Sequence, residues 1–144
     1  MGDYVAWDQR AAATMLERDF GWRPSPSPKG SDYQGFNGID CDALEVNDYL
    51  KYLKYGYDRA TDSACIDVRK GYISRDEAVR LVQRYGGRVP QESIWRFVDY
   101  LDRDMEWFLG VAERFTNTDL FSREPHGTFS RDIDGRLVPR FRVA

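Results

Sequence analysis

The sequence is poor in the residues that build metal clusters and disulfide frameworks. Its 144 residues include only two cysteines and one histidine. Cys41 and Cys65 stand 24 positions apart, so they form neither a CxxC metal clip nor a disulfide framework. A metal site built from Cys and His would need both thiols and His126 together. We therefore expect no metal site and two reduced thiols, as in a cytoplasmic protein.

Long apolar runs and a strong charge imbalance are also missing. No stretch of about 18 apolar residues occurs, so we expect no membrane span. The N-terminal segment 1–8 is acidic and lacks the apolar run of a signal peptide, which favours a cytoplasmic location. Lys and Arg number 21 against 24 Asp and Glu, for a net charge of −3 and a pI near 5.2. This balance argues against a nucleic-acid partner.

Familiar catalytic motifs are absent as well. The sequence contains no GxSxG, Walker loop, HExxH or dinucleotide fingerprint, so it leaves the catalytic residues unknown. His126, between Pro125 and Gly127, is typical of a surface position. The acids Asp99, Asp102 and Asp104 are better explained by a helix boundary than by metal binding.

The residues that are present predict an all-α protein. The length fits one domain, and hydrophobic residues make up 42% of the chain, with aromatic residues at 15%. Apolar residues recur at helical spacing, and caps and glycines separate the runs. We expect Asp8 to cap the first helix and Gly21 to end it, Thr61 or Asp62 to cap the third, and a capping box at Ser74–Glu77 to begin the fourth. We expect a compact bundle of about six helices, with a Pro-rich loop after the first helix and an irregular or hairpin C-terminal tail. The expected helices span about 8–20, 43–57, 61–70, 74–85, 90–101 and 102–115.

Each expected helix has a stripe of side chains predicted to face the core. Tyr52 and Tyr55 lie outside the stripe of the second helix. The stripes consist of Ala12, Met15, Leu16 and Phe20 in the first helix; Val46, Tyr49, Leu50, Leu53 and Tyr57 in the second; Ala78, Leu81, Val82 and Tyr85 in the fourth; Ile94, Phe97, Val98 and Leu101 in the fifth; and Met105, Phe108, Leu109 and Ala112 in the sixth.

The periodicity fades after Phe115, which divides the chain into a helical domain, 1–115, and an extended basic tail, 116–144. Between Arg123 and Arg142 the tail holds five arginines and three acids. Asp134-Gly135 favours a small hairpin between 129–133 and 137–141. We expect a peripheral arm.

The link between the second and third helices concentrates cations and tyrosines. Lys51, Lys54 and Arg59 precede an expected helix N-terminus at 61–63, and free N–H groups there suit phosphate or carboxylate. Arg59 can add a bidentate contact. In the alternative interpretation, Thr61 only caps the helix and Arg59 pairs with Asp58 or Asp62.

The same region resembles the C-terminal part of the N-acetyl sugar amidotransferases, PP-loop ATPases of lipopolysaccharide and surface-glycan biosynthesis. The resemblance covers most of 4–115 and includes WD at 7–8 and FGW at 20–22. Its specific part consists of NDYLKYLKYG at 47–56, RATD at 59–62, DVRKG at 67–71 and SRDEA at 74–78.

The resemblance implies conversion of the acetamido group of a nucleotide-sugar into an acetamidino group. ATP adenylates the amide oxygen, and ammonia from glutaminase and cyclase-like subunits then displaces AMP. The substrate-binding residues implied are Lys54, Tyr55, Arg59, Thr61, Asp62 and Arg69, and Tyr57 is a further candidate for stacking on a ring.

The cysteine-rich segment and the SGGxDS pyrophosphate loop of full members do not occur in this sequence. We therefore expect no cofactor in this chain: ATP and Mg²⁺ would bind a PP-loop half on another chain. In the alternative hypothesis, the chain is a non-catalytic assembly module. It would form a homo-oligomer or join other subunits through the aromatic residues Trp95, Trp107, Phe108 and Phe121.

Overall fold

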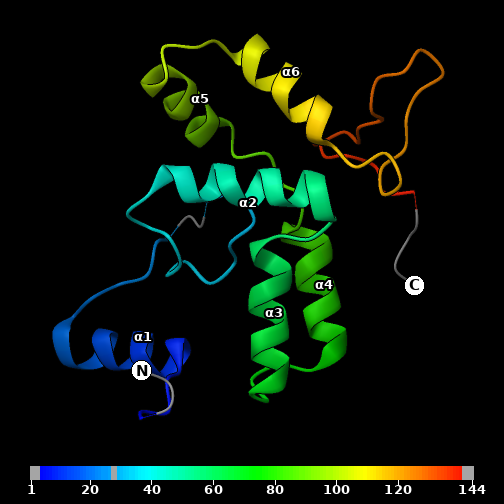
Figure 1. Ribbon diagram of the computed structural model, residues 1–144. Coiled ribbons are helices and arrows are strands. Elements are labelled where there is room, and N and C mark those ends of the chain that lie inside the picture. The colour runs from blue at the N-terminus through cyan, green and yellow to red at the C-terminus, as the bar shows by residue number, and fades with distance from the viewer. Residues whose placement is uncertain (1–3, 27–28, 141–144) are drawn as a thin grey trace.

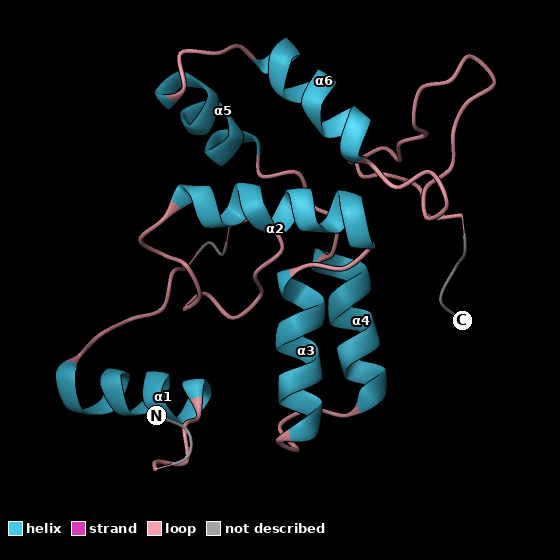
Figure 2. Cartoon of the chain, in the orientation of Figure 1, coloured by secondary structure: helices cyan, strands magenta, loops and turns pink. Residues whose placement is uncertain are grey.

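The computed structural model describes residues 4–26 and 29–140, and all regular elements within them are helices (Figures 1 and 2). The all-α prediction is confirmed. The helices are α1 (Gln9–Phe20), α2 (Asp42–Tyr55), α3 (Arg59–Arg69), α4 (Arg75–Tyr85), α5 (Gln91–Tyr100) and α6 (Met105–Phe115).

Helix α2 crosses the middle of the molecule, with α5 and α6 on one side and the α3–α4 pair on the other (Figure 1). Its residues Val46, Tyr49 and Leu53 are buried, as their helical spacing predicts. They meet Ile94 and Val98 of α5. The remaining buried members of this core are Phe108 and Ala112 of α6 and Phe121, Phe129 and Leu137 of the tail.

Helices α3 and α4 lie side by side and pack through small side chains (Figure 1). Ala60, Ala64 and Ala78 are buried, and their small size lets the two backbones approach closely. Ser74 caps α4 by accepting a 3.2 Å hydrogen bond from the backbone N–H of Glu77, which confirms the expected cap. The pair thus holds α3 in a fixed position below α2.

The tail is part of the core, so the expectation of a peripheral arm needs correction. Phe121 is fully buried, and its ring centroid lies 5.2 Å from that of Tyr52. Tyr52 lies outside the core-facing stripe of α2, as the sequence pattern predicts, but it packs against the tail. Burial raises the pKa of Tyr52 to about 12. The tail packs on the core through three apolar residues spaced eight apart, Phe121, Phe129 and Leu137. Because core residues are predicted from helical spacing, this pattern goes unrecognised in the sequence.

The tail also contains the expected turn at Asp134-Gly135. An antiparallel bridge pairs Arg131 with Leu137, and the backbone N–H of Asp132 donates to the carbonyl of Arg136 at 2.9 Å. The rest of the expected second strand extends to Phe141, which lies outside the described residues.

Helix α1 differs most from expectation, because none of its residues is buried. Asp8 caps it and Gly21 ends it in the left-handed conformation, as predicted. However, Met15 and Leu16 are exposed, and Phe20 is 74% exposed. The extended segment after Gly21 carries the helix away from the core (Figure 1). The large side chains of its apolar stripe therefore stay exposed.

Three other expected core residues are exposed for simple geometric reasons. Gly56 ends α2 with a φ of 78°, so Tyr57 lies beyond the helix and leaves its stripe. Leu101 lies in the turn after α5. Leu109 follows the buried Phe108 and points to another side of α6.

Candidate functional site

The bend between α2 and α3 is built around the buried carboxylate of Asp58. Its side chain is only 2% exposed and accepts hydrogen bonds from the backbone N–H groups of Ala60, at 3.1 Å, and Gly87, at 2.7 Å. Asp58 caps α3, which therefore begins at Arg59. The expectation that Thr61 or Asp62 caps this helix is wrong. A carboxylate that also ties down Gly87 gives a better-satisfied cap than either residue.

This cap removes the basis for an anion site at the helix N-terminus. The amide of Asp62 already donates to the carbonyl of Asp58 at 3.1 Å, and the Asp58 carboxylate occupies the end of the helix. Burial raises the pKa of Asp58, although the hydrogen bonds from Gly87, Ser31 and Ala60 oppose this shift. In its ionised form Asp58 also repels a second anion at the same position.

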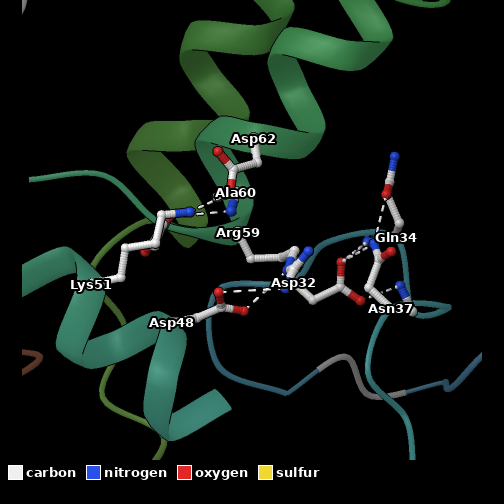
Figure 3. A network of polar contacts seen from close by, with 10 residues as sticks. Asp32, Gln34, Asn37, Asp48, Lys51, Arg59, Ala60 and Asp62 are labelled. Carbon is white, nitrogen blue, oxygen red and sulfur yellow. Dashed lines mark hydrogen bonds and ion pairs between the residues drawn. The ribbon is translucent and has the colours of Figure 1, made fainter. Parts of the chain in front are cut away.

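Arg59 is held by α2, as the close-up in Figure 3 shows. Its Nε and Nη2 atoms donate to the two carboxylate oxygens of the buried Asp48 at 3.0 and 3.4 Å. Lys51 forms an ion pair with Asp62 in the same region. The cavity beside Arg59 has a volume of about 20 Å³, enough for about one water molecule. These pairs fix the angle between α2 and α3 and neutralise two cations.

The solvent-facing part of the bend consists of tyrosines and lysines. The ring centroids of Tyr55 and Tyr57 lie 6.2 Å apart, and both rings are exposed. The Nζ atom of Lys54 lies 5.2 Å from the Tyr55 centroid, and that of Lys51 lies 4.6 Å from the Tyr57 centroid. This surface can stack on a planar ring and place positive charge beside it.

The structure brings together some of the predicted substrate-binding residues and separates others. Lys54 and Tyr55 share the exposed surface of the bend, whereas Arg59 and Asp62 form the pairs with α2 described above. Thr61 is half-buried in the first turn of α3. Arg69 ends α3, about 15 Å from Arg59 at the rise of an α-helix. Arg69 therefore lies apart from the bend.

A larger cleft, of about 340 Å³, lies near the C-terminal half of α3. The segment before α1, the loop around Gln34 and the end of α3 form its walls. Its lining residues are Trp7, Asp8, Gln9, Arg10, Gln34, Phe36, Ser63, Ile66, Asp67, Lys70 and Tyr72. Sequence reasoning missed this cleft, because its walls come from distant segments, such as those of Asp8 and Tyr72, 64 positions apart, and no local motif marks it.

Asp67 holds the walls of this cleft together. It is 1% exposed, and its Oδ2 atom accepts hydrogen bonds from Arg10 Nη2 at 2.5 Å, the Tyr33 hydroxyl at 2.7 Å and Gln34 Nε2 at 3.0 Å. Burial, followed by the bond to Asp67, raises the pKa of Tyr33 above its usual value. The sequence offers one signal for this buried carboxylate. Asp67 lies at helical spacing from Ala60, Ser63 and Ala64, so it shares the buried face of α3 with these small residues.

The loop that supplies Gln34 is itself fixed by the buried Asp32. Asp32 accepts hydrogen bonds from the backbone N–H groups of Gln34 and Gly35 at 3.1 and 2.8 Å, and from Asn37 Nδ2 at 3.3 Å (Figure 3). Gly35 has a φ of 75°, and an added Cβ would lie 2.7 Å from the carbonyl oxygen of Ser25. A glycine is therefore required here, and the wall of the cleft is preorganised.

Other candidates from the sequence show simpler roles. His126 is exposed in the tail, with its Nε2 atom 2.7 Å from the hydroxyl of Thr128. Asp104 caps α6 by accepting from the N–H of Trp107 at 2.7 Å. Cys41 and Cys65 are both free and exposed. In residues 4–26 and 29–140, no cluster of three His, Cys, Asp or Glu residues is arranged to hold a metal ion, and no helix has the length and apolarity to cross a membrane.

Residues 30–133 match the family described as LPS biosynthesis protein WbpG-like, C-terminal domain. This range is more than half of the chain. The chain belongs to this family. No curated protein matches it.

The family match confirms the resemblance to the C-terminal part of a lipopolysaccharide biosynthesis family. The match covers α2 to α6 and the tail as far as residue 133. It therefore includes the two ion pairs of the bend, Arg59–Asp48 and Lys51–Asp62. Helix α1 and the segment before it lie outside the match. Consequently the large cleft combines a wall inside the family domain with a wall outside it.

Proposed function

We propose that this chain is the helical, substrate-binding part of an ATP-dependent N-acetyl sugar amidotransferase of lipopolysaccharide or O-antigen biosynthesis. Membership of a lipopolysaccharide biosynthesis family over residues 30–133 is the observation that carries this proposal. The resemblance of 47–78 to the amidotransferases supplies the reaction class. The substrate is a nucleotide-activated N-acetyl sugar, and the reaction is cytoplasmic.

The ATP chemistry belongs to another chain in this proposal. Within the described residues no glycine-rich loop follows a strand, because the regular elements there are all helices, so this part of the chain does not fit a pyrophosphate cradle. A PP-loop ATPase half would hold ATP and Mg²⁺. Glutaminase and cyclase-like subunits would supply ammonia. We expect no ATP turnover by this chain alone.

The residues of this chain act at the exposed face of the bend. Tyr55 and Tyr57 offer two neighbouring aromatic rings for the base or the sugar ring of the substrate. Lys54 forms no ion pair within the described chain, so its charge is available to a diphosphate. Arg59 and Asp62 act as positioning residues, because their ion pairs to α2 fix the angle of the bend.

The proposal is tested by AMP release in a mixture of this chain, a PP-loop ATPase half, ATP, glutamine and UDP-N-acetylglucosamine. We expect release to require this chain and to fall at least tenfold with Lys54→Ala or Tyr55→Ala. Arg80→Ala, which removes an exposed cation of α4, is the matched control and should leave the rate unchanged. Equal AMP release without this chain, or with Lys54→Ala, would contradict the proposal.

A second candidate function is an assembly module, and the outer face of α5 and α6 favours it. Trp95 is 65% exposed, and Trp107 and Leu109 are also exposed. Two of the four aromatic residues expected to make subunit contacts, Phe108 and Phe121, are instead buried in the core. Sedimentation of the chain alone tests self-association: a dimer that Trp95→Ala dissociates would support this function, and a monomer at all concentrations would exclude a homo-oligomer.

A further inference from the structure

The large cleft differs from the bend in position, size and charge. It adjoins Ser63, Ile66 and Asp67 of α3, whereas the bend lies at the N-terminal end of that helix. Its volume of about 340 Å³ is at the lower end of the range of small-molecule sites, roughly 300–1,000 Å³. That volume accommodates a single ring more readily than a whole nucleotide-sugar.

Aromatic and aliphatic side chains give the cleft apolar surface on both walls. Trp7 and Phe36 belong to the N-terminal segment and the loop, and Ile66 and Tyr72 belong to the α3 side. Trp7 is 62% exposed although it borders a concave site, so much of its ring lacks a protein partner. The C–H face of a pyranose ring packs against such an aromatic surface and removes it from water.

The charges of the cleft cancel. Asp8 lies 3.6 Å from the Nζ atom of Lys70, and Asp67 pairs with Arg10, so the two acids balance the two cations. A net-neutral site gives little attraction to a phosphate, whereas its carboxylates and amides suit the hydroxyl groups of an uncharged ligand.

Hydrogen-bonding capacity is left over for such hydroxyls. Asp8 accepts from the N–H of Ala11 and from the hydroxyl of Tyr72, whereas a carboxylate has about four acceptor positions. The Nε atom of Arg10 is buried and lacks a hydrogen-bond partner, the only such side-chain atom in the described part of the chain. This atom has under 1 Å² of exposed surface, so a ligand oxygen satisfies it only after the Arg10 side chain turns toward the cleft.

We propose that this cleft binds a neutral pyranose, with its ring stacked on Trp7 and its hydroxyls bonded to Asp8, Arg10 and the neighbouring amides. This inference goes beyond the proposed function: Trp7, Asp8 and Arg10 lie outside the family match, and the site is separate from the bend. It gives the N-terminal segment a role in saccharide recognition that does not require ATP or a partner chain.

The test uses the chain alone with methyl β-D-glucopyranoside and its 2-acetamido analogue as probes, and inorganic phosphate as the anionic comparison. We expect saturation transfer from protein to sugar in NMR, a shift of the Trp7 indole N–H signal, and a Kd on the order of millimolar. Trp7→Ala should weaken binding at least tenfold. Trp95→Ala, which removes an equally exposed tryptophan from α5, should leave it unchanged.

Two further variants make the outcome unambiguous. Tyr72→Ala, on the α3 side of the cleft, should also weaken binding, whereas Lys54→Ala at the bend should not. The inference is overturned if neither sugar shows saturation transfer, if Trp7→Ala binds as the unaltered chain does, or if phosphate and not sugar shifts the Trp7 signal. Sugar binding that survives Lys54→Ala separates this site from the amidotransferase proposal, so either can fail without the other.

Discussion

Asp58 shows how one side chain decides the chemistry of a whole bend. A carboxylate in place of a hydroxyl at the N-cap brings negative charge to the end of α3 and hydrogen-bonds Gly87 on the far side of α4. Asp58 therefore excludes a second anion from this end of α3 and also joins α3 to the loop before α5. Arg59, the first residue of α3, pairs with Asp48 and so joins α3 to α2 as well.

The pH dependence of Asp58 is the prediction at this scale. Because burial raises its pKa in the folded state above the value of 3.8 for a free side chain, the folded protein binds this proton more tightly than the unfolded chain does. The stability that protonation of Asp58 contributes is fully present below pH 3.8 and is lost as the pH rises through the folded-state pKa. A ¹³C NMR titration of the Asp58 carboxyl group should show its inflection above 3.8. An inflection at or below 3.8 would contradict this account.

At the scale of elements, α1 is attached to the molecule by polar contacts. No residue of the helix is buried, and Arg10 pairs with Asp67 while its cap Asp8 hydrogen-bonds Tyr72 and lies near Lys70. Hydrogen bonds from the Ala11 N–H and Tyr72 lower the pKa of Asp8, which keeps it charged. Such contacts are screened by salt, unlike the apolar packing of the other helices.

Arg10→Ala should therefore release α1 and leave the core intact. The loss is expected to be about 1 kcal/mol of docking free energy, because Arg10 is partly exposed and its ion pair is partly screened. Hydrogen exchange should become faster in residues 9–20 and stay unchanged in α2. Arg18→Ala on the same helix is the control, since Arg18 pairs only with its neighbour Asp19 at the surface. Unchanged exchange in α1 with Arg10→Ala would show that other contacts hold the helix.

The sequence predicts the elements better than their contacts. Helical spacing locates α2 and its buried Val46, Tyr49 and Leu53, and the Ser74 motif locates the start of α4, because both signals are local. The burial of α1 is predicted wrongly, because an apolar stripe shows only that a helix has one apolar face and not whether another element covers it.

The candidate site divides in the same way. The tyrosines and Lys54 of the bend are recognisable in the sequence, since neighbouring residues form that surface. The cleft around Asp67 is not, because the donors to Asp67 come from positions 10, 33 and 34. Long-range pairing of this kind depends on the path of the loop between α1 and α2, which local propensity does not determine.

At the scale of the whole molecule, the tail closes a core that the helices leave open. Helices α2, α5 and α6 each contribute apolar side chains to it, and Phe121, Phe129 and Leu137 complete it. Arg136 in the tail also donates to the backbone carbonyls of Gln83 and Arg84, at 3.2 and 3.1 Å, near the end of α4. The tail therefore contacts both halves of the molecule, above and below α2 (Figure 1).

This arrangement predicts that the tail and the helices unfold together. Phe121→Ala removes a fully buried ring that packs on Tyr52, and should cost about 3–5 kcal/mol of unfolding free energy. Urea unfolding followed by helical circular dichroism and by the NMR signals of tail residues 121–137 should show one common transition at a lower urea concentration. Ile133→Ala is the control from the same tail: its side chain is fully exposed, so the midpoint should not move. If Phe121→Ala instead leaves the helical transition in place, the tail is an accessory to a core that is already complete, and the burial of Phe121 contributes only to tail docking.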